Sequence, residues 1–240
     1  EIRLGIYGNE DPMYILAGLP FIAPDYSSAW LLKDVQMEYL QEKFDKKGLM
    51  ILYTAPWPGQ GFYTKFPVNS VSDFSGKKLR IYSTATQQMG SMLGFNATIL
   101  PFAEIPQAFS TGLIEALFTS PQTGIDIQAW DNTKHFTYAG AIFSKNAVVV
   151  TKKAFNALSK GDQSNMLAAA KKAELRGWEM SAETTKKQIG ILKKNGMSSK
   201  NAPDEVISKM KSIGLEMMKN WRSKASPEAN AVLDRYLSMR

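Results

Sequence analysis

Hydrophobic and polar residues repeat at spacings that predict two strands with a helix between them. In EIRLGIY (residues 1–7) every second residue is apolar, which predicts a strand with one buried face. LMILYTA (49–55) is nearly all apolar and predicts a second, more deeply buried strand. Residues 25–48 carry apolar side chains at helical spacing, with a serine of DYSS suited to the N-cap and Gly48 to the stop.

Short strands and helices alternate in the middle of the chain. The five segments, in order strand, helix, strand, helix and strand, are KKLRIYS (77–83), TATQQMGSMLG (84–94), ATILPF (97–102), AEIPQAFSTG (103–112) and EALFTS (115–120). This alternation within a little over forty residues predicts a mainly parallel sheet with helices on its faces. Ligands of such sheets bind at the carboxyl ends of the strands.

The second half of the chain changes from extended to helical structure. HFTYAGAIFSKNAVVVTKKAF (135–155) is too long for one ordinary strand and is predicted to carry the chain from one sheet to another. A helix is predicted from Ser159 to Gly196, which would be about 50 Å long and would link two lobes. Two further amphipathic helices are predicted, one reaching Trp221 and one beginning at Ser226.

The composition limits the chemistry. The chain has 240 residues, 44% of them hydrophobic, which suits one large domain or two small ones, and no run approaches the roughly 18 apolar residues of a membrane span. The absence of cysteine excludes disulfides, thiolate nucleophiles and thiolate metal sites. His135 is the only histidine, which excludes a catalytic triad and a multi-histidine metal centre. We therefore expect no catalytic residues, no metal and no cofactor.

The net charge is +7, which admits nucleic acid, an anionic membrane or a small anion as partner. The lysines come as spaced doublets without one dense stripe and without an interleaved aromatic platform. This distribution is typical of a solvated surface, so we expect a small anionic ligand and no nucleic acid.

One cation stands out because it lies inside a predicted strand. Alternation places Leu79 and Ile81 on one face and Arg80 and Tyr82 on the other. The guanidinium needs a partner, and a structural carboxylate or a ligand anion would each satisfy it. The helix predicted to begin near Thr84 would present unpaired backbone N–H groups at the same strand end, which favours the ligand.

Hydroxyl side chains follow another strand of the same unit. FTSPQTG (118–124) ends that strand with Thr119 and Ser120 beside a proline. Hydroxyls at this position can orient a polar ligand, although a turn uses the same residue types.

Four segments resemble one known family, the periplasmic solute receptors (DctP-type) of tripartite ATP-independent periplasmic (TRAP) transporters. The resemblance covers essentially the whole chain. The segments are GLPFIAPDYSSAWLL (18–32), VSDFSGKKLRIYS (71–83), LPFAEIPQAFSTGLIEALFTSP (100–121) and AVVVTKKAFNALSKGDQ (147–163).

The resemblance implies an α/β, two-lobed periplasmic binding protein fold of class II, with mainly parallel sheets and a long helix that spans both lobes. The expected division is residues 1–56 and 146–185 for lobe I, 57–145 and 186–215 for lobe II, and 216–240 for C-terminal helices packed on the lobes. Family members usually begin with another strand and helix before a segment like EIRLGIYG, so an N-terminal strand and helix set is expected to be missing.

The resemblance also implies a function. Such receptors are periplasmic. They close over a small organic acid such as a carboxylate and deliver it to the membrane permease subunits of a TRAP transporter. The protein is expected to be a monomer. The carboxylate-binding arginine of the family falls on Arg80. A sensing or scavenging module without transport is the alternative, and an enzyme on the same fold is a third possibility.

The chain departs from the family pattern at two places. Tyr63 stands where a second arginine is common, and Thr119, Ser120 and Pro121 replace an acidic residue, asparagine and proline. These changes favour a ligand with one strong anionic group and a less charged remainder. The other expected ligand contacts, several of them aromatic and equally suited to core packing, are Trp57, Gln60, Phe102, Trp130 and Asn146.

Overall fold

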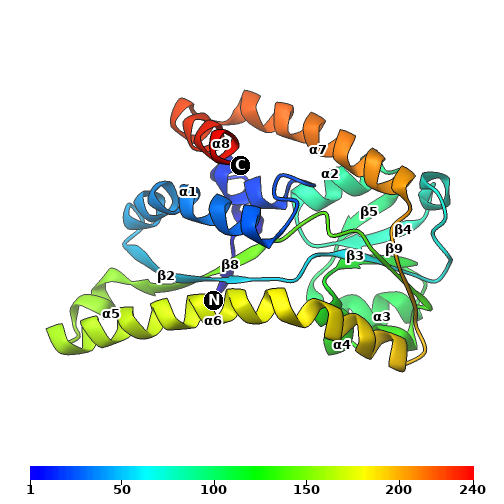
Figure 1. Ribbon diagram of the computed structural model, residues 1–240, viewed down its shortest axis with the longest axis horizontal. Coiled ribbons are helices and arrows are strands. Elements are labelled where there is room, and N and C mark those ends of the chain that lie inside the picture. The colour runs from blue at the N-terminus through cyan, green and yellow to red at the C-terminus, as the bar shows by residue number, and fades with distance from the viewer.

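Two β-sheets lie side by side, joined by two extended segments and one long helix (Figure 1). The computed structural model describes residues 1–240. The three-stranded sheet has the order β1 (Ile2–Arg3), β8 (Lys145–Thr151), β2 (Leu49–Pro56). The six-stranded sheet has the order β5 (Asn96–Ile99), β4 (Lys78–Ile81), β6 (Ala116–Thr119), β3 (Gly61–Thr64), β7 (His135–Tyr138), β9 (Ser198–Asn201).

The strand directions differ between the two sheets. In the six-stranded sheet β4 runs parallel to β5 and β6, and β7 runs parallel to β9, so the predicted mainly parallel arrangement is confirmed there. Only β3 runs antiparallel to its neighbours. The three-stranded sheet is antiparallel throughout, against the prediction, because β8 returns along β2 with Leu49 opposite Thr151 and Pro56 opposite Lys145.

The helices that the sequence predicted occur in the predicted order, whereas α4 and α5 were not predicted. The α-helices are α1 (Tyr26–Asp45), α2 (Thr84–Met92), α3 (Ile105–Ser110), α4 (Pro121–Asp126), α5 (Lys152–Asn156), α6 (Lys160–Lys194), α7 (Asp204–Lys224) and α8 (Pro227–Met239). The short 3-10 helices are η1 (Leu4–Tyr7), η2 (Pro12–Gly18), η3 (Val71–Phe74), η4 (Phe102–Glu104) and η5 (Ala129–Asp131). None of the helices is both long and apolar enough to cross a membrane.

Two local predictions are wrong. The strand expected over residues 1–7 is only two residues long, because the backbone turns into η1 at Leu4. The N-cap of α1 is Asp25, not one of the serines, because its carboxylate accepts a hydrogen bond of 2.7 Å from the N–H of Ser28. A charged acceptor satisfies this N–H better than a hydroxyl and also interacts favourably with the helix dipole.

Helix α6 runs along both sheets, as the sequence predicts for a helix shared by two lobes (Figure 1). Glu174 holds it to β2 by accepting hydrogen bonds from the N–H and hydroxyl of Thr54, at 2.9 and 2.7 Å. About four turns later Gln188 donates to Gln122 of α4 at 2.8 Å. The helix is therefore fixed to elements on both sides of the crossing segments.

The two crossing segments, residues 57–60 and 139–144, are hydrogen bonded to each other. The N–H of Trp57 donates to the carbonyl of Ser144 at 2.8 Å, and the N–H of Gly140 donates to the carbonyl of Gln60 at 2.9 Å. The chain changes sheets here, next to the expected lobe boundaries at 56/57 and 145/146. The complete lobe division stays a prediction, and its boundary at 215/216 falls inside the continuous helix α7.

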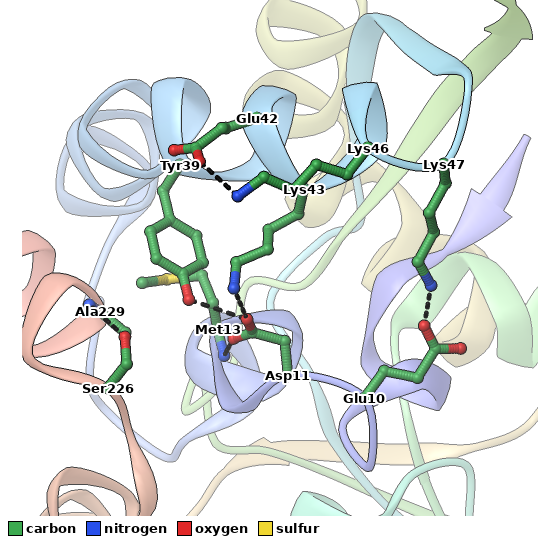
Figure 2. Close-up of polar contacts among 10 residues, drawn as sticks. All are labelled: Glu10, Asp11, Met13, Tyr39, Glu42, Lys43, Lys46, Lys47, Ser226 and Ala229. Atoms are coloured by element: carbon green, nitrogen blue, oxygen red, sulfur yellow. Dashed lines mark hydrogen bonds and ion pairs between the residues drawn. The ribbon is translucent and has the colours of Figure 1, made fainter.

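The segment before α1 is fastened by one buried carboxylate (Figure 2). Asp11 accepts hydrogen bonds from the Met13 N–H at 2.9 Å and the Tyr39 hydroxyl at 2.8 Å, and pairs with Lys43 at 2.8 Å. Burial alone would raise the pKa of the Asp11 carboxyl, but these three donors outweigh it and hold the pKa below its usual value. We call these four residues the Asp11 cluster.

Candidate ligand-binding cleft

Strand β4 places one cation at the centre of the candidate site. Leu79 and Ile81 are fully buried in the main hydrophobic core, so Arg80 points to the opposite face, as alternation predicts. Arg80 is only 2% exposed, and its Nε donates to the carbonyl of Leu100 at 3.1 Å. It forms no ion pair with the protein. Its pKa is lowered to about 10, mainly by burial and to a smaller extent by repulsion from Arg3.

Arg80 lies in a cleft of about 490 Å³ between the two sheets. A volume of this size suits a small organic molecule. Both sheets and both crossing segments contribute side chains. The lining residues are Glu1, Arg3, Ile6, Trp57, Gln60, Arg80, Tyr82, Phe102, Thr119, Ser120, Thr123, Asp126, Ser144 and Asn146.

Most of the residues singled out from the sequence meet in this cleft. The eight that line it are Trp57, Gln60, Arg80, Tyr82, Phe102, Thr119, Ser120 and Asn146. They come from segments as distant as residues 57 and 146, which the crossing of the chain between the sheets brings together. Their roles as ligand contacts stay predictions.

Three predicted residues lie elsewhere. Tyr63 is fully buried in a second core on the same face of the six-stranded sheet as Arg80, where its hydroxyl donates to the carbonyl of Ser120 at 3.2 Å. Gly124 allows this, because a Cβ there would approach the Tyr63 hydroxyl to 2.0 Å. Trp130 packs on the same second core, and Thr84 lines a separate hollow beside Trp221.

Two of the N–H groups at the start of α2 are satisfied by side chains of the same turn. The Ser83 hydroxyl accepts from the Thr86 N–H at 3.2 Å, and the Thr86 hydroxyl accepts from the Ser83 N–H at 3.1 Å. This capping box satisfies the N–H groups of Ser83 and Thr86 and leaves those of Thr84 and Ala85 outside it. The predicted convergence of Arg80 and this helix end on one anion stays a prediction.

A chain of hydrogen bonds fixes the side chains next to Arg80. The Tyr82 hydroxyl donates to the side-chain oxygen Oε1 of Gln60 at 2.6 Å, and the side-chain Nε2 of Gln60 donates to the Ser144 hydroxyl at 3.1 Å. Burial raises the pKa of Tyr82 to about 12, so the phenol is a neutral donor. This chain connects the strand that carries Arg80 to both crossing segments.

Several lining residues were missed from the sequence. Arg3 lies at the cleft with its guanidinium carbon 5.6 Å from the centre of the Tyr82 ring, a cation–π contact. Arg3 occupies an alternate position of EIRLGIY between apolar residues, the same signal that identified Arg80. Ser144, Thr123 and Asp126 carried no distinguishing pattern.

The charges in the cleft are unevenly satisfied. The carboxylate of Glu1 accepts from the Asn146 amide at 2.7 Å, and Asp126 accepts from the Gln122 amide at 2.6 Å. Both acids are exposed, whereas Arg80 is buried and has only a neutral carbonyl as partner. The arrangement can bind an anionic group at Arg80. No group of three or more His, Cys, Asp or Glu side chains could hold a metal ion.

Comparison with known proteins gives a consistent result. Residues 3–224 match the family described as bacterial extracellular solute-binding protein, family 7 (DctP). DctP7, a Bordetella pertussis extracytoplasmic solute receptor binding pyroglutamic acid, is 36% identical, with a TM-score of 0.94 over 97% of this chain and 77% of that one. A marine metagenome TRAP solute-binding protein, in complex with co-purified pyroglutamate, is 31% identical, with a TM-score of 0.92 over 98% and 77%.

A curated solute-binding protein of Chromohalobacter salexigens is 24% identical over 198 residues, 79% of this chain. The chain spans only 58% of the length of that relative. The two-lobed α/β fold expected from the sequence is confirmed by the solved structures.

Proposed function

Since the chain belongs to family 7 of the bacterial extracellular solute-binding proteins, we propose that it is a receptor that captures a small organic anion by lobe closure and delivers it to a TRAP-type transporter. The observation that carries the proposal is Arg80. This buried guanidinium faces a cleft between two sheets and lacks a carboxylate partner in the protein. A bound carboxylate would supply the missing charge in bidentate geometry.

The expected ligand has one carboxylate and an uncharged polar remainder. Arg80 offers the one deeply buried cation of the cleft, while Thr119, Ser120 and Ser144 offer neutral hydroxyls. Pyroglutamate has this composition, since its lactam ring carries a neutral N–H and carbonyl. It is the first compound to test because the receptors that bind it are 36% and 31% identical to this chain.

Lobe closure follows from the two-sided lining of the cleft. Arg80 and Thr119 belong to the six-stranded sheet, and Arg3 and Asn146 belong to the three-stranded sheet. A ligand that contacts both sides favours the state in which they are close together. Residues 57–60 and 139–144 are the connections that a hinge motion would bend.

Periplasmic location and a partnership with permease subunits follow from the same proposal. A permease that recognises the closed form would distinguish loaded from empty receptor. The chain has no cysteine, and no histidine lines the cleft, so we propose that the ligand leaves chemically unchanged.

The test is a thermal-shift screen of small organic acids, followed by calorimetry. The expected result is stabilisation by a monocarboxylate, because a ligand that binds only the folded state raises its stability. The matched control is pyroglutamamide, which keeps the ring but replaces the carboxylate by a neutral amide and should bind far more weakly. Absence of binding by every organic acid, or equal binding of acid and amide, would contradict the proposal.

A further inference from the structure

A second buried cation lies behind the cleft. Lys145, the first residue of β8, is 5% exposed, and its side chain reaches α1. Its Nζ donates to the side-chain oxygen Oε1 of Gln36 at 2.7 Å, which is the only hydrogen bond of the Lys145 side chain. Gln36 is held in this orientation because its amide N–H₂ faces the Met13 carbonyl and sulfur at 3.4 and 3.2 Å.

No carboxylate compensates this ammonium group. Asp34 of α1 and Glu174 of α6 form ion pairs with Lys33, at 2.5 and 3.4 Å, and not with Lys145. Lys33 adds repulsion to the cost of burial, and together these lower the pKa of Lys145 to about 7. An anion from outside the protein would therefore stabilise the charged form near neutral pH.

A small, partly enclosed space lies beside this group. Its volume is about 30 Å³, room for roughly two waters. Lys145, Arg3, Ser83 and Ser144 contribute the donors, and no acidic side chain is among the fifteen lining residues. Arg3, Tyr82 and Ser144 separate this space from the ligand cleft, because they line both. The space is too small for an organic acid.

We propose that this space is a binding site for a small monovalent inorganic anion of the size of chloride, held by the Lys145 ammonium group. Two cationic side chains, those of Lys145 and Arg3, line the space together with hydroxyl side chains, and the buried Lys145 has only one neutral hydrogen-bond partner. The site is distinct from the cleft in which the organic acid is proposed to bind.

The test is the melting temperature of the ligand-free Arg80→Ala variant, which lacks the cation proposed to bind organic acids, in sodium chloride and in sodium gluconate at equal ionic strength. Chloride is expected to raise the melting temperature by about 2–4 °C over gluconate, because gluconate is too large to enter. Lys145→Met should abolish the difference, whereas Lys186→Met, at an exposed position of α6, should keep it. Equal melting temperatures of the Arg80→Ala variant in the two salts would overturn the proposal.

A second variant keeps the test decisive if Lys145→Met does not fold. Gln36→Glu places a carboxylate beside the ammonium group and should remove the chloride dependence while leaving the fold intact. Crystals soaked in bromide should show an anomalous peak within hydrogen-bond distance of Lys145. A cavity with water only in those crystals would overturn the proposal.

The pH dependence gives an independent readout. The groups facing Lys145 from its surroundings are Arg3, Lys33 with its partner Glu174, Tyr14 and Tyr82; burial raises the pKa of both tyrosines, so they stay neutral. The chloride effect should weaken as pH rises through about 7, where Lys145 loses its proton. A chloride effect that is unchanged up to pH 9 would contradict the role of Lys145.

Discussion

The Asp11 cluster and the cleft around Arg80 each contain a buried charge, and they treat it in opposite ways. Asp11 has three donors from the protein, one of them the ammonium group of Lys43, all within 2.9 Å (Figure 2). Arg80 has one neutral carbonyl acceptor and faces open space. The folded chain completes the surroundings of Asp11 and leaves those of Arg80 incomplete.

This difference separates a structural charge from a binding charge. A buried ion that the protein satisfies stabilises the fold, and its removal leaves other buried groups without partners. A buried ion that the protein leaves unsatisfied costs stability until a ligand arrives. We therefore expect substitutions at the two places to affect different measurements.

The largest expected effect is on ligand affinity at Arg80. Arg80→Ala should weaken binding of the organic acid found in the screen by about 2–5 kcal/mol, because the carboxylate loses its buried partner. Folding stability should stay the same or rise, since an uncompensated charge is removed. Calorimetry and thermal melting measure the two quantities. The Arg80→Lys variant should bind the acid more tightly than Arg80→Ala and more weakly than the unaltered protein. Undiminished affinity in Arg80→Ala would rule out the role of Arg80 in binding the carboxylate.

Asp11→Asn should show the reverse behaviour. Loss of the charge-assisted bonds is expected to lower the free energy of unfolding by about 1–3 kcal/mol with ligand affinity unchanged. Urea denaturation gives the free energy. The exposed pair of Glu10 and Lys47 nearby is the matched control, and Glu10→Gln should cost less than about 1 kcal/mol. A variant of Asp11 as stable as the control would show that the cluster does not fasten the segment.

The contribution of Asp11 should also depend on pH. Its pKa is lower in the folded chain than the 3.8 of a free side chain, so its stabilisation is fully present above about pH 4. It is lost as the pH falls through the lowered folded value. The stability difference between the unaltered protein and Asp11→Asn should therefore shrink below pH 4, and a constant difference down to pH 2 would contradict the assignment.

The smallest effect is expected at the hydrogen-bonded chain beside Arg80. Tyr82→Phe removes the donor to Gln60 and should reduce ligand affinity by about 0.5–1.5 kcal/mol, because the walls of the cleft lose a fixed orientation. Tyr236→Phe is the control, since that hydroxyl donates to the Ile22 carbonyl far from the cleft. It should change stability and leave affinity unaltered. Equal affinities of both variants would show that the chain does not position the site.

The sequence predicted Arg80 because β4 is buried with a simple alternation of apolar and polar side chains. The same reasoning could not place Tyr63, because β3 is buried on both faces. Its consecutive residues Phe62 and Tyr63 point to opposite faces and enter two different cores. It also could not identify Lys145, because a lysine at the start of an apolar strand gives no sign of whether it is covered.

The sequence by itself determined the alternation of strands and helices over residues 77–120, the length of α6 and the presence of an arginine inside a strand, because these depend on spacing along the chain. It did not predict β3, β9, α4 or α5. Only the tertiary structure decided that Asp11 has Lys43 as its partner, that Arg80 has no acidic partner, and that Trp57 and Asn146 share one cleft. The physical reason is that the charge a buried group meets depends on segments distant in sequence, which the crossing of the chain between the two sheets brings together.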